Sequence, residues 1–132
     1  EARPGAILVG HSLGCALIAH AAFTHSGARI GGALMVAPAD LELPSPIKAS
    51  LASFAPMPLA PLPFPSIVAA SAVILRLPRR ARRFAEAWRS EFVNLGPVGH
   101  VNIAPGPGPW PEGIALLQRR SDQVAATGAR AA

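Results

Sequence analysis

A serine between two glycines stands near the start of the chain, in the pattern G-x-S-x-G formed by residues 10–14. An apolar run at residues 6–9 precedes it, and helix-forming residues at 15–22 follow it. Strand, sharp turn and helix around such a serine are typical of nucleophilic catalysis, because the strained turn lifts the hydroxyl clear of the sheet. The two glycines leave room where strand and helix crowd together. We therefore predict that Ser12 is a nucleophile; the alternative is a serine that caps a helix.

The residue after this serine can contribute to an oxyanion hole. The predicted helix begins here, so the positive end of its dipole faces the place where an oxyanion would form. We expect the backbone N–H of Leu13 to be one of the donors.

A histidine occurs later, in the position that a general base needs. Residues 91–95 are typical of a short strand, and the glycines and proline at 96–99 end it. His100 follows. Where a G-x-S-x-G serine is catalytic, the chain order is serine, acid, histidine, with the histidine in a loop after the last core strand. We interpret His100 as the base that takes the serine proton and returns it to the leaving group. The alternative is an ordinary loop histidine.

Neither a metal nor a nucleotide site is predicted. His20 and His25 have no cysteine or carboxylate at metal-ligand spacing. The glycines at 27, 31 and 32 do not form G-x-G-x-x-G, and no Walker lysine is present. We expect no cofactor.

Composition indicates one domain with a buried core. The chain has 132 residues, of which 51% are hydrophobic and 14% charged. Apolar runs are shorter than a membrane span, so we expect no membrane partner. The single cysteine, Cys15, cannot form an internal disulfide and favours a reducing compartment, which we take to be the cytoplasm. Its place in the predicted helix favours a small buried side chain over a second nucleophile.

The net charge of +5 comes from arginines, which make up eleven of the twelve basic residues. Five of them fall within residues 76–83. A phosphate-binding patch is one interpretation, but interleaved aromatic residues are missing and we expect no nucleic-acid partner. A solvated face or miscoded sequence explains the cluster better.

The predicted elements alternate between strands and helices, which places the fold in the α/β class. Apolar and helical patterns then indicate the remaining elements: strands at 33–37 and 67–70, helices at 80–89 and 114–120, a proline-rich extended connection at 44–65, and a mobile tail at 121–132. Trp88 shares one helical face with Ala81, Phe84 and Ala85, so we expect it in the core.

Six segments resemble, in the same order, the α/β-hydrolase family that includes retinoblastoma-binding protein nine and bacterial YdeN-type proteins. They are residues 8–15, 32–38, 61–66, 84–88, 99–102 and 108–113. The resemblance implies a mostly parallel sheet flanked by helices and a serine hydrolase with Ser12 as nucleophile and His100 as base. It implies a small ester, thioester or amide as substrate, cleaved through an acyl-enzyme.

Two departures from the family bear on activity. Family members carry earlier strands, and a loop there supplies a second oxyanion donor. We therefore expect residues 1–120 to be the C-terminal part of a single α/β-hydrolase domain, with the N-terminal strands missing. The family's triad aspartate follows the strand at 67–70, but residues 71–78 contain no carboxylate. Asp40 is a possible replacement acid, and an ordinary polar loop is its alternative role.

A local frameshift is our hypothesis for the missing acid, because codons for residues 73–75 can be read in another frame as Asp-Pro. Two functions follow from these observations. One is a serine hydrolase that is impaired in this chain. The other is a non-catalytic domain of hydrolase ancestry that binds a protein partner, or an inactive fragment.

Overall fold

The structure is a computed structural model that describes residues 5–24, 29–41, 49–71, 77–96 and 110–131. The elements follow one another as β1 (Ala6–His11), α1 (Leu13–Thr24), β2 (Ile30–Val36), the 3-10 turn η1 (Ala52–Phe54), β3 (Ser66–Ala70), α2 (Leu77–Trp88), β4 (Glu91–Asn94) and α3 (Pro111–Ala131). Within these residues, none of the helices combines the length and apolar character that crossing a membrane requires.

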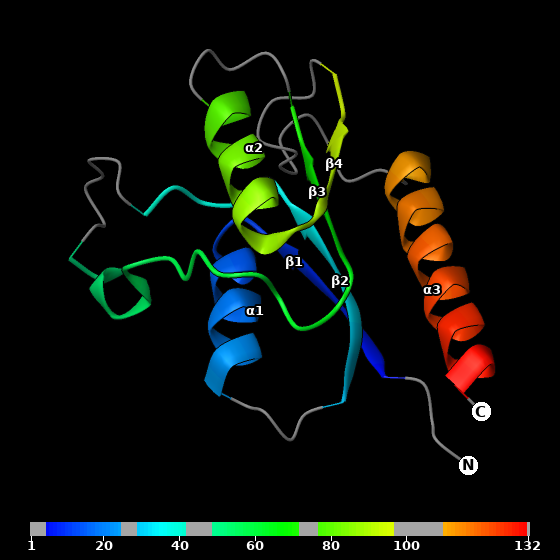
Figure 1. Cartoon of the computed structure of the whole chain (residues 1–132). Helices are drawn as coiled ribbons and strands as arrows, with labels where there is room; N and C mark the ends of the chain where they lie inside the picture. Colours follow the sequence, from blue (N-terminus) through cyan, green and yellow to red (C-terminus); the bar gives the residue numbers. More distant parts are fainter. Residues whose placement is uncertain (1–4, 25–28, 42–48, 72–76, 97–109, 132) are drawn as a thin grey trace.

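Four parallel strands form one sheet in the order β1-β2-β3-β4 (Figure 1). α1 and α2 cover one face, and α3 covers the other. Parallel strands need helices on both faces, because the connections that return the chain to the same end are themselves helical. The α/β class and the parallel sheet predicted from the sequence are confirmed.

Side chains along β2 divide the core into two layers. Ala33 and Met35 are buried beneath α1 and α2, whereas Leu34 and Val36 are buried on the side of α3. Alternation of this kind follows from the two-residue period of a strand. Trp88 is only 1% exposed, and its indole N–H donates to the Pro58 carbonyl at 2.6 Å. Its predicted place in the core is confirmed.

The last helix is longer than the sequence predicts. We expect it over 114–120, but α3 spans Pro111–Ala131. A Cβ added to Gly31 would lie 2.9 Å from Cγ1 of Val124, so the second half of α3 packs closely on β2. Tertiary packing of this kind extends helices that local propensity leaves marginal. The mobility of the residues after 120 stays a prediction.

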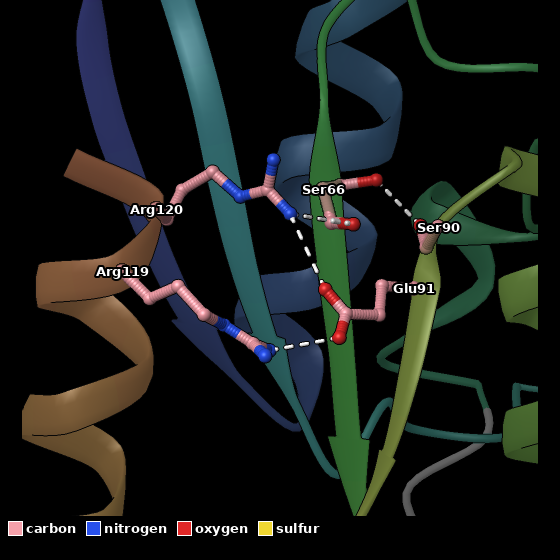
Figure 2. Close-up of polar contacts among 5 residues, drawn as sticks. All are labelled: Ser66, Ser90, Glu91, Arg119 and Arg120. Carbon is pink, nitrogen blue, oxygen red and sulfur yellow. Dashed lines mark hydrogen bonds and ion pairs between the residues drawn. The ribbon is translucent and has the colours of Figure 1, made fainter. Parts of the chain in front are cut away.

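Polar contacts fasten α3 at the amino ends of β3 and β4 (Figure 2). Arg120 is buried, with Nη2 3.5 Å from the Ser66 carbonyl oxygen and 3.9 Å from Oε2 of Glu91. Arg119 reaches Oε1 of Glu91 at 2.9 Å, and the hydroxyls of Ser66 and Ser90 bond to each other. Burial lowers the pKa of Arg120, while Glu91 opposes that effect. The cluster lies at the amino ends of the strands, whereas the turn that holds the predicted nucleophile lies at their carboxyl ends.

Candidate active site

Ser12 forms the turn between β1 and α1, and its φ is +55°. This left-handed conformation is unfavourable for a residue with a Cβ, by roughly 1–3 kcal/mol, and persists only where the surroundings enforce it. Its N–H donates to the Val36 carbonyl at 3.0 Å, and its carbonyl accepts from the Ala39 N–H at 3.2 Å. The predicted context of strand, sharp turn and helix is therefore present, with the turn held by the neighbouring strand and the loop after it.

The two glycines of the motif have different roles. A Cβ at Gly10 would lie 2.7 Å from Cδ1 of Ile18 and 2.8 Å from the carbonyl atoms of Gly14. At Gly14 an added Cβ would meet nothing within 4 Å. The expectation that both glycines prevent a clash is therefore right for Gly10 and wrong for Gly14. Only Gly10 lies where the strand and the helix approach each other.

Leu13 is the first residue of α1. The first four N–H groups of a helix have no acceptor within it, and the positive end of the helix dipole lies there. The chain direction thus puts the Leu13 N–H at the same turn as Ser12. Its role in an oxyanion hole stays a prediction.

His100 lies outside the described residues, so its geometry relative to Ser12 stays a prediction. The backbone at residues 95 and 96, which precedes His100 in the chain, is fixed by hydrogen bonds. Leu95 N–H donates to the Ala70 carbonyl at 2.9 Å, and Ser71 Oγ donates to the Gly96 carbonyl at 2.7 Å. Gly96 has a φ of +72°, which suits glycine. Residues 95 and 96 therefore lie at the carboxyl ends of the strands, and Ser12 lies at the same end of the sheet.

Asp40 is engaged by an arginine from α2. Its side chain is 3% exposed, and its Oδ2 and Oδ1 lie 2.5 Å from Nε and 3.1 Å from Nη2 of Arg80. Arg80 is 27% exposed. The sequence interpretation of the arginine cluster as a solvated face is therefore wrong for this residue. Forty positions separate the partners, and no local pattern signals the pair. The role of Asp40 as a replacement acid stays a prediction.

Cys15 is fully buried in α1, with Sγ 3.4 Å from the Gly10 carbonyl oxygen and 3.5 Å from that of Val36. Burial raises the pKa of its thiol to about 12, although the contact with Val36 works in the opposite direction. The thiolate is the nucleophilic form of cysteine. At neutral pH this thiol is protonated and enclosed, as expected of a structural side chain.

Comparisons with known proteins agree with this arrangement. The family model described as serine hydrolase matches residues 1–119. A solved structure from Pectobacterium atrosepticum SCRI1043, described as a YdeN-like hydrolase, is 32% identical with a TM-score of 0.70. The alignment covers 89% of this chain and 60% of that one, so the chain spans 60% of the length of its structural neighbour. Among curated proteins, none matches.

Proposed function

The chain belongs to the serine hydrolase family of the α/β-hydrolase type, and from this premise we propose that it cleaves a small ester, thioester or amide through an acyl-enzyme on Ser12. The left-handed turn of Ser12 between β1 and α1 is the observation that supports this function best. A nucleophile on such a turn has its hydroxyl lifted from the sheet, where a substrate carbonyl can reach it.

In the proposed reaction, Ser12 Oγ attacks the substrate carbonyl, His100 takes the hydroxyl proton, and the Leu13 N–H stabilises the oxyanion. The chain length allows His100 to take part. Three strand spacings separate β1 from β4, which is about 14 Å. Six residues lead from Asn94 to His100, and an extended segment of that length spans up to about 20 Å.

We propose that catalysis is weak. Residues 71–78 provide no carboxylate to orient His100, and Asp40 is already paired with Arg80. In a serine protease, loss of the charged acid lowers the rate by about 10⁴, because the imidazole takes the wrong tautomer. The same missing carboxylate favours the second candidate function, a non-catalytic domain that binds a protein partner. We propose the cytoplasm as the compartment, in keeping with the lone buried cysteine.

Labelling with a fluorophosphonate probe tests the proposal, since the probe reports an activated serine even where turnover is slow. We expect the unchanged chain and Ser53→Ala, which removes an exposed serine of η1, to be labelled alike. Ser12→Ala should lose the label, and His100→Gln should slow labelling. Equal labelling of Ser12→Ala and the unchanged chain, or no labelling of either, would reject Ser12 as a nucleophile and leave the binding function.

A further inference from the structure

We propose that the Asp40–Arg80 ion pair is a clamp that positions Ser12, acting through the backbone of Ala39. This inference rests on the proposed nucleophilic role of Ser12 and deepens it. Asp40 and Arg80 are positioning residues here, because they act on the serine through another residue.

The Ser12 turn depends on the end of β2 and the loop that follows. Ser12 donates to Val36 and accepts from Ala39, so contacts from two sides fix its peptide groups. Ala37, between them, also has a left-handed φ of +46°, and its N–H donates to the Ala69 carbonyl at 2.8 Å. Two non-glycine residues in this conformation, each of which donates to the end of a neighbouring strand, need outside contacts to stay there.

Asp40 provides such a contact, because it comes directly after Ala39. Its buried carboxylate accepts one charge-assisted hydrogen bond from Arg80 Nη2 at Oδ1 and forms an ion pair with Arg80 Nε through Oδ2, which restrains the position of the loop. Separating a buried carboxylate from its cation is costly, because it leaves an uncompensated charge away from water. A movement of the loop away from the serine would therefore strain or separate the ion pair.

α2 holds the other half of the clamp rigidly. Three of its side chains, Ala81, Phe84 and Trp88, are buried in the core against the sheet. Its first turn contains Arg80 and no acidic residue. The contacts then run without a break from α2 through Asp40 and Ala39 to Ser12.

Three variants test the clamp: Asp40→Asn, Arg80→Gln and the double variant. Glu91→Gln is the matched control, because it breaks an arginine–carboxylate pair at the amino ends of the strands, the end opposite to Ser12. We expect each single variant to slow fluorophosphonate labelling of Ser12 by about tenfold to a hundredfold, the usual effect of a small misplacement of a reacting group. The double variant should be no slower than either single one. Glu91→Gln should match the unchanged chain.

Two further readouts separate positioning from other roles. The amide hydrogen of Ala39 should exchange faster in Asp40→Asn and Arg80→Gln, which needs no activity to measure. The pH dependence of labelling should keep its midpoint, because the proposed clamp acts on Ser12 through the Ala39 backbone and not on the base. Arg80→Lys keeps a cation and should restore part of the labelling rate, which distinguishes loss of the clamp from failure to fold.

Slower labelling in Asp40→Asn but not in Arg80→Gln, with a shifted midpoint, would make Asp40 the triad acid and overturn the clamp. Unchanged Ala39 exchange in both single variants, or a double variant slowed by the product of the single effects, would overturn it too. If the proposed function fails instead, the unchanged chain will not be labelled at all. The exchange rate of the Ala39 amide hydrogen would then be the test of the clamp.

Discussion

Gly10→Ala should destabilise the fold, whereas Gly14→Ala should not, although both glycines lie two residues from Ser12. The new methyl group at position 10 would lie 2.7 Å from Ile18 Cδ1 and 2.8 Å from backbone atoms of Gly14. The end of the Ile18 side chain can rotate away, but the backbone of α1 cannot. The helix must therefore move from the strand by several tenths of an ångström to reach ordinary contact at about 3.5 Å. Such overpacking costs about 1–3 kcal/mol.

At position 14 the methyl group enters open space. Alanine also favours a helix over glycine by up to about 1 kcal/mol, so Gly14→Ala should be neutral or stabilising. Urea unfolding followed by circular dichroism measures both effects. With a slope of about 1–3 kcal/mol per molar urea, the midpoint of Gly10→Ala should fall by roughly 1 M. An unchanged midpoint for Gly10→Ala, or equal losses in the two variants, would refute the close approach of β1 and α1 as the reason for the glycine.

Two other predictions concern the buried thiol and the missing acid. The Cys15 thiol ionises near 9.0 in an unfolded chain and near 12 when folded, so between these pH values only the unfolded state has lost the proton. The free energy of unfolding should then fall by roughly 1 kcal/mol per pH unit above pH 9. Cys15→Ala should flatten that slope in urea titrations, since the chain has no tyrosine and a single lysine to mask it; an identical slope would contradict the burial argument. Ile74→Asp combined with Leu75→Pro should speed labelling of Ser12 by up to about 10⁴, the factor lost when a triad acid is neutralised. Ile74→Asn with Leu75→Pro is the control, and equal rates for the two would show that no acid is needed there.

Elements with strong local signals could be predicted from the sequence. The strands at 6–9, 67–70 and 91–95 were predicted within about two residues of the observed ones, because short apolar runs next to glycine or proline have few alternatives. The helix around Trp88 was predicted for the same reason. α3 was predicted too short, since its second half depends on contact with β2 rather than on a pattern of its own.

The same difference between local signals and long-range contacts applies to the candidate site. The turn at Ser12 could be predicted because the motif that encodes it is contiguous. The pairing of Asp40 with Arg80 could not, because it joins a loop and a helix forty residues apart. The unequal roles of Gly10 and Gly14 also needed the structure, since the sequence places them symmetrically and only the direction of each missing Cβ separates them.

The ion pair and the missing acid act on different parts of the proposed reaction. A carboxylate in a triad must face the imidazole, because it fixes the tautomer and stabilises the imidazolium that forms. Asp40 directs both carboxylate oxygens to Arg80, so its charge is already compensated, and an imidazolium would gain less from it. The proposed clamp would let Ser12 keep its left-handed turn even where residues 71–78 provide no acid for His100. Holding the nucleophile in place and making it reactive are separate requirements, and we propose that the contacts of Asp40 serve the first and not the second.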